Sequence, residues 1–173
     1  SLKPIIQHFE YSLNRELLDK LEQLVKNAKV SLPTVYYCAW GFLMQRYDYN
    51  EDITFDITLS GRSNRIINID KELGLFINTV PIRVKSNCND KIADILVTIQ
   101  KDIANLQEQQ FLKYKDYLDL NDNYFKSSFS SLVVVENYPI SLNEYLEPLG
   151  LKIESIKFKE ATRYDMTLVI SNF

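Results

Sequence analysis

A glycine turn and the strand that leaves it lie in the run Leu73-Gly74-Leu75-Phe76-Ile77-Asn78-Thr79-Val80-Pro81-Ile82-Arg83. The apolar and β-branched residues that continue to Lys85 predict a strand over 79–85, preceded by a turn-like element over 74–78. Gly74 is one of only four glycines in the chain, and a glycine here predicts a bent backbone or a close approach by another chain or a ligand. Asn78 and Thr79 either line a cavity or form the turn into the strand.

A second strand and a second glycine turn precede this run. Residues 52–59, Asp-Ile-Thr-Phe-Asp-Ile-Thr-Leu, are rich in β-branched types and predict a strand, and Ser60-Gly61-Arg62-Ser63-Asn64 ends it as a loop. Arg62 is a rigid cation with several donors, which needs a carboxylate or phosphate partner if it is buried. The alternative is an exposed loop cation, and the spacing alone favours neither.

The rest of the chain adds helices to these strands. Asn14 is a candidate N-cap for a first helix, and Ser31 caps a second, 34–46, whose apolar residues on nearly all sides predict a central position. Asn89 is expected to cap a long third helix. Further expected segments are an extended stretch at 5–13, a polar region with a short helix at 107–128, and strands at 131–137, 151–158 and 163–171. The expected inner faces are Leu17, Leu18, Leu21, Leu24, Val25 and Ala28 in the first helix, and Ile92, Ile95, Leu96, Ile99, Ile103 and Leu106 in the third.

This order of strands and helices, with two long helical crossovers, predicts a layered α/β fold. At 173 residues the chain has the size of one domain or of one lobe of a larger one, and its 46% hydrophobic and 25% charged residues are typical of a globular protein. The net charge of −3 includes no basic block, so no nucleic-acid partner is expected.

The sequence predicts a cytoplasmic protein. Lys3, His8 and Glu10 interrupt any apolar core of a signal peptide, and the longest uncharged stretch, 30–45, is too short to span a membrane. Cys38 lies in an apolar run and Cys88 in a polar loop, so no disulfide framework is implied and a reducing compartment is expected.

No self-sufficient active site is evident in these residues. His8 is the only histidine, and without a serine or cysteine motif to pair with it we interpret it as a strand residue at a lobe edge, not as a general base. The two cysteines and one histidine offer no metal-ligand spacing, and neither a Gly-x-Ser-x-Gly elbow nor a glycine-rich phosphate loop occurs. We therefore expect no metal and no directly bound cofactor.

Together, these stretches resemble the condensation domains of nonribosomal peptide synthetases. The similarity extends over essentially the whole chain and is most specific at 73–83, which resembles the Gly-x-Phe-x-Asn-Thr motif of the family. Residues 59–62 are similar to its Ser-Gly-Arg turn. Other matching segments are 9–13, the helix from Val30 to Tyr47, the strand at 131–139 and the closing strand at 161–168.

The resemblance implies a fold and a location in a larger domain. The expected fold is an α/β two-layer sandwich, a mixed sheet with helices packed on one face, which is half of a chloramphenicol-acetyltransferase-like two-lobe fold. Residues 1–173 would form the carboxy-terminal lobe, truncated at both ends. The His-His-x-x-x-Asp-Gly motif of the family, which carries its catalytic histidine, belongs to the amino-terminal lobe and does not occur here.

The resemblance also implies a function and partners. Condensation domains form amide bonds between thioesters that peptidyl carrier proteins deliver on 4'-phosphopantetheine. This lobe would supply one wall of the substrate tunnel and contacts to the amino-terminal lobe, with no catalytic residue of its own. Arg62 would pair across the lobe boundary with the aspartate of the histidine motif. The implied tunnel residues are Ser60, Gly61, Gly74, Phe76, Asn78 and Thr79. Alone, the lobe is expected to be inactive and to self-associate through its partner-facing surface.

Three alternatives remain open at this point. An epimerization domain of the same superfamily usually carries a Gly-Trp-Phe-Thr type sequence where this chain has 74–79, which favours condensation. A free-standing acyltransferase of the superfamily is the second alternative, and a non-catalytic docking or scaffold lobe is the third. The presence or absence of the double-histidine motif in the residues encoded upstream would decide between a catalytic parent and a scaffold.

Overall fold

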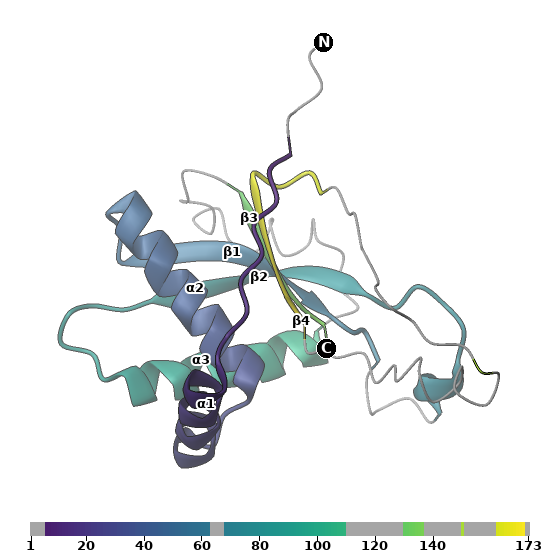
Figure 1. The fold of residues 1–173 in the computed structure, drawn as a ribbon, viewed down its shortest axis with the longest axis horizontal. Coiled ribbons are helices and arrows are strands. Elements are labelled where there is room, and N and C mark those ends of the chain that lie inside the picture. The colour runs from purple at the N-terminus through teal and green to yellow at the C-terminus, as the bar shows by residue number, and fades with distance from the viewer. Residues whose placement is uncertain (1–5, 63–67, 110–129, 137–149, 151–161, 172–173) are drawn as a thin grey trace, which may run out of the picture.

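The computed structural model describes residues 6–62, 68–109, 130–136, 150 and 162–171. Within them the chain forms, in order, α1 (Arg15–Ala28), α2 (Leu32–Asp48), β1 (Asp52–Leu59), a short 3-10 helix η1 (Ile69–Lys71), β2 (Asn78–Lys85), α3 (Ile92–Glu108), β3 (Ser131–Glu136) and β4 (Met166–Ser171). Figure 1 shows η1 beyond one end of β1 and β2, apart from the helices.

The described strands form one mixed sheet in the order β2-β1-β3-β4. β1 pairs antiparallel with β2, whereas β1 with β3 and β3 with β4 pair parallel. The parallel pairs are possible because long connections separate these strands in the chain. The mixed sheet of the predicted α/β fold is therefore confirmed.

Pro81 lies in β2, which has only β1 beside it in the described sheet. The N–H of Ser86 donates to the carbonyl of Glu51, so alternate residues of β2 turn their backbone donors toward β1. Pro81 occupies one of the positions between them, where a donor would point away from β1. A proline is tolerated there because it removes no hydrogen bond of the β1–β2 ladder.

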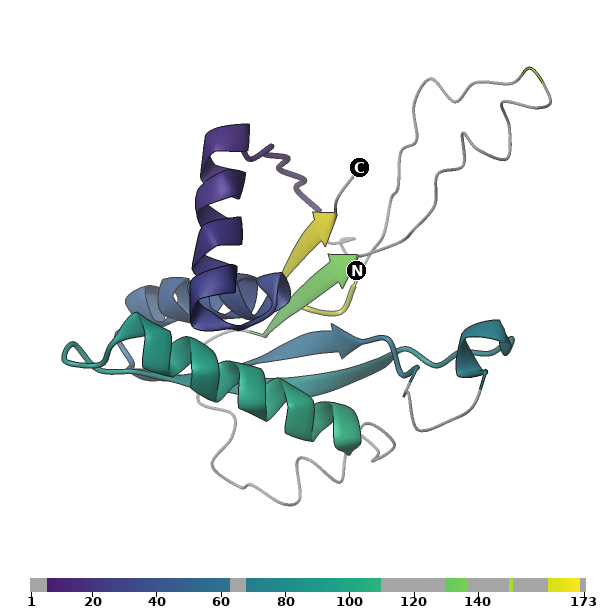
Figure 2. The ribbon, with the colours of Figure 1, turned by 90° about the horizontal axis from the view of Figure 1, so that it is seen from below.

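The helices pack on one face of the sheet, as Figures 1 and 2 show. Side chains alternate across a strand, so one side of β1 and β2 carries Ile53, Phe55, Ile57, Val80, Ile82 and Val84, all buried. α2 and α3 cover this side, and α1 lies against both of them. Two layers, sheet and helices, therefore share one apolar core.

The second helix is central, as predicted. Its Gly41 lies directly against β2, and a Cβ at this position would come within 2.6 Å of the Val84 side chain. Trp40, one residue earlier, is buried and donates its indole N–H to the Ser131 hydroxyl on β3 at 3.1 Å. A small residue and a large one side by side thus let α2 approach β2 closely while still reaching β3.

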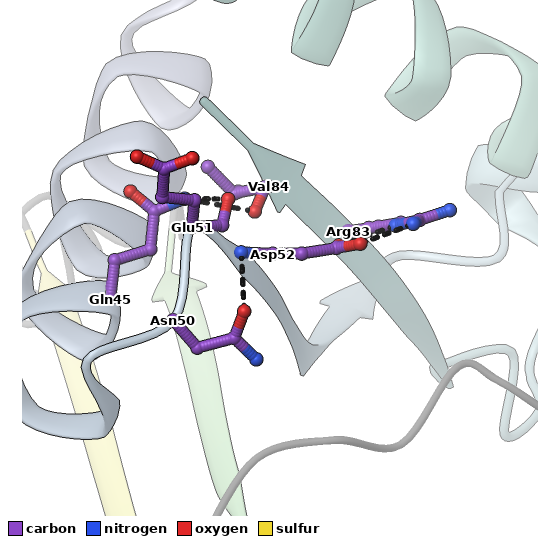
Figure 3. Close-up of polar contacts among 6 residues, drawn as sticks. All are labelled: Gln45, Asn50, Glu51, Asp52, Arg83 and Val84. Carbon is purple, nitrogen blue, oxygen red and sulfur yellow. Dashed lines mark hydrogen bonds and ion pairs between the residues drawn. The ribbon is translucent and has the colours of Figure 1, made fainter. Parts of the chain in front are cut away.

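Polar contacts tie α2 to the start of β1 and the end of β2 (Figure 3). The Gln45 amide donates to the carbonyls of Glu51 at 2.7 Å and Val84 at 3.1 Å. The Asp52 carboxylate accepts two bonds from the Arg83 guanidinium, one of them from Nε at 2.6 Å. The two Gln45 bonds satisfy backbone acceptors where α2 ends. The Arg83–Asp52 pair joins the two strands to each other.

Several sequence predictions are confirmed. Asn14 caps α1 by accepting from the Leu17 N–H at 2.9 Å, and β1 has the predicted bounds. Cys38 is buried and Cys88 exposed, and neither forms a disulfide. β2, β3 and the last strand were predicted within a few residues of their bounds, although 163–165 precede β4 instead of forming its beginning.

Four predictions were wrong in detail. Lys91 and not Asn89 precedes the first residue of α3, because the turn before it closes on itself through bonds from Asn87 N–H to the Asp90 carboxylate and from Asn89 N–H to the Asn87 side chain. Ile92 is 57% exposed and does not belong to the inner face of α3.

The other two concern the first segment and the inner face of α1. Residues 6–13 form no strand and are exposed, so His8 is a surface residue instead of a strand residue. Leu17 is 42% exposed and does not belong to the inner face of α1. Ser31 is the N-cap of α2, as predicted, although its hydroxyl bonds the Thr34 hydroxyl and not a backbone N–H of the first turn. The predicted strand at 151–158 and residues 110–128 of the polar region lie outside the described residues.

Candidate functional site

The two glycine turns of the sequence meet at one end of the sheet. Gly61 follows β1 with φ at +67°, and a Cβ on it would overlap the carbonyl oxygen of Phe76. Gly74 lies near the Phe76 side chain, where a Cβ would be 3.1 Å from the aromatic ring. Glycine at 61 is therefore required both by the left-handed backbone and by the close approach of the second turn.

Arg62, in the first turn, contacts the second turn and the segment that leads to it. Its guanidinium lies over the Phe76 ring at 4.9 Å from the ring centre. It donates to the carbonyl of Ile69 and, at 3.3 Å from both terminal nitrogens, to the carbonyl of Glu72. We call Gly61, Arg62, Ile69, Glu72 and Phe76 the turn clasp. Because the acceptors are backbone carbonyls, no pattern of side chains in the sequence could have revealed them.

Arg62 is exposed, and no carboxylate forms an ion pair with it among the residues that the structure describes. The sequence left open whether Arg62 is a buried cation with an acidic partner or an exposed loop cation, and its exposure favours the exposed loop cation. Its guanidinium is nevertheless held in place by stacking and by two carbonyls, so it is more ordered than a free surface arginine.

The remaining predicted site residues lie around the clasp. Ser60 accepts from the Arg62 N–H at 3.4 Å. Asn78 begins β2 opposite Leu59 and accepts from the Thr79 N–H at 2.9 Å. Thr79 lies opposite Thr58 on the face of the sheet that the helices do not cover. The fold thus brings all seven predicted site residues to one end of the β1–β2 hairpin.

A polar pair that the sequence did not single out lies on the same face, opposite the described helices. Asp56, in the middle of β1, is only 4% exposed, and its carboxylate accepts from the Tyr164 hydroxyl at 2.6 Å. Burial, together with the hydrogen bond and charge of Asp56, raises the pKa of Tyr164 to about 12. A carboxylate between Phe55 and Ile57 in a strand was the only sequence signal for this pair.

Replacing Tyr164 with phenylalanine should lower the free energy of unfolding by about 1–3 kcal/mol near neutral pH, because a bond to a buried carboxylate is lost. The pKa of Tyr164 is higher in the folded chain than its ordinary value of 10. Its stabilising contribution is therefore complete below pH 10 and disappears as the pH rises toward 12.

Urea unfolding of the original protein and of the Tyr164→Phe variant, at several pH values from 8 to 12, would measure this contribution as the difference between their free energies of unfolding. The comparison is needed because burial also raises the pKa of Tyr37 to about 12, so both proteins lose stability in this range. A stability difference that does not shrink between pH 10 and 12 would contradict the assignment.

The described residues contain no group of three or more His, Cys, Asp or Glu side chains that could hold a metal ion. None of their helices has the length and hydropathy needed to cross a membrane. Burial raises the pKa of the Cys38 thiol to about 11, so it is a poor nucleophile at neutral pH.

Comparison with known proteins then places the chain in a family. The model of the condensation domain family matches residues 6–172. The chain belongs to the condensation domain family. Its relatives include Tyrocidine synthase 2 of Brevibacillus parabrevis, 32% identical over 94% of this chain, and Gramicidin S synthase 2 of Brevibacillus brevis, 25% identical over 94%. The chain spans only 5% and 4% of the length of these two proteins.

Solved structures show the same fold for this condensation-domain chain. The SgcC5 protein from Streptomyces globisporus has a TM-score of 0.59 at 18% identity, with 74% of this chain and 29% of that protein covered. The first condensation domain of the CDA synthetase has a TM-score of 0.57 at 17% identity, covering 71% and 27%. The mixed sheet with helices on one face is thus part of the chloramphenicol-acetyltransferase-like fold of condensation domains.

Proposed function

We propose that this chain is the carboxy-terminal lobe of a condensation domain that forms amide bonds between carrier-bound aminoacyl or peptidyl thioesters. The turn clasp is the observation that carries the proposal. It joins the two turns that resemble the Ser-Gly-Arg and Gly-x-Phe-x-Asn-Thr sequences of the family, although 11 residues separate Arg62 from Gly74 in the chain. In this role the end of the hairpin supplies one wall of a substrate tunnel, formed by Ser60, Gly61, Gly74, Phe76, Asn78 and Thr79.

The chemistry proposed for the whole domain needs two thioesters and one base. The amine nitrogen of the acceptor attacks the thioester carbonyl carbon of the donor. A C–N bond forms, the C–S bond breaks, and the amine proton leaves with the donor thiol or through a base. The only histidine of this chain, His8, is exposed in the irregular segment before α1, so the proposed base belongs to the amino-terminal lobe. This lobe contributes by holding the amine and the thioester carbonyl close together and correctly oriented.

The proposed partners are the amino-terminal lobe and peptidyl carrier proteins, which would deliver both substrates on 4'-phosphopantetheine arms. The exposed guanidinium of Arg62 supports the lobe contact. It already has two carbonyl partners and an aromatic support, so one of its remaining edges can pair with a carboxylate without further ordering of the side chain. We propose that the aspartate of the His-His-x-x-x-Asp-Gly motif supplies this carboxylate.

The test is amide formation between two loaded carrier proteins, followed by mass spectrometry of the product. The parent domain should form the amide, whereas this chain alone should form none, because its polypeptide lacks the proposed base. Arg62→Ala in the parent should lower the rate by roughly 10–100-fold through misplacement of the lobes.

Arg62→Lys is the matched variant, because it keeps the charge but loses the planar fork and should recover only part of the rate. Turnover by the isolated chain would overturn the assignment of the base to another lobe. A full rate for Arg62→Ala in the parent would overturn the role of Arg62.

A further inference from the structure

We draw no further inference here: the strongest candidate, the groove between α3 and the outer side of β2, is lined by charges of both signs, among them Arg83, Lys85, Asp94 and Asp102, and nothing in the structure shows what would occupy it.

Discussion

Replacing Gly61 with alanine should open the turn clasp and remove the activity of the parent domain. The backbone at Gly61 has φ at +67°, where an alanine costs about 1–2 kcal/mol. The added Cβ would also overlap the Phe76 carbonyl oxygen, which is backbone and cannot rotate away. The two turns must therefore separate, and Phe76 must leave its position under Arg62.

Hydrogen exchange measured by mass spectrometry should show the separation as faster exchange of the amides at 68–77. Gly150→Ala is a matched control, because Gly150 has nearly the same φ, +69°, but a Cβ there meets nothing within 4 Å. The control should be destabilised only by the strain of an alanine in a left-handed backbone. Similar exchange and similar activity in the two variants would mean that the contact with Phe76 is not what requires the glycine.

Replacing Trp40 with alanine should lower the free energy of unfolding by about 3–5 kcal/mol, because it leaves a cavity in the core that the neighbours fill only partly. Trp40 is 7% exposed and bridges α2 to β3 through its bond to the Ser131 hydroxyl. Ser131 is itself 4% exposed and would lose this partner. For a domain whose total stability is about 5–15 kcal/mol, this is a large fraction.

Urea unfolding followed by far-UV circular dichroism would measure the change, since Trp40 is the only tryptophan and its fluorescence disappears with it. Trp40→Phe keeps most of the apolar volume and removes the N–H donor, so it should cost less than alanine. Tyr49→Ala is the surface control, because Tyr49 is 97% exposed, and should stay within about 0.5 kcal/mol of the original. A loss for Trp40→Ala no larger than this would contradict the central position of α2.

Sequence patterns predicted the elements better than their ends. The run at 52–59 is rich in β-branched residues throughout and lies in a buried sheet. Its bounds could therefore be predicted without tertiary information. The start of α3 was misplaced because Asn87, Asn89 and Asp90 are all acceptable caps. In the folded turn the side chains of Asp90 and Asn87 accept from the backbone N–H groups of Asn87 and Asn89 instead of capping the helix. Local propensity cannot rank several equivalent caps.

By itself, the sequence determined the periodicity of the strands and helices, the glycines at the two turns and the residues around them, because these depend on side-chain type and local backbone freedom. Only the tertiary structure decided that Gly61 meets Phe76, that Arg62 binds the carbonyls of Ile69 and Glu72, and that Tyr164 reaches Asp56. Such contacts join distant segments, in part through backbone atoms that every residue shares. Their formation depends on how the whole chain packs, which no local pattern encodes.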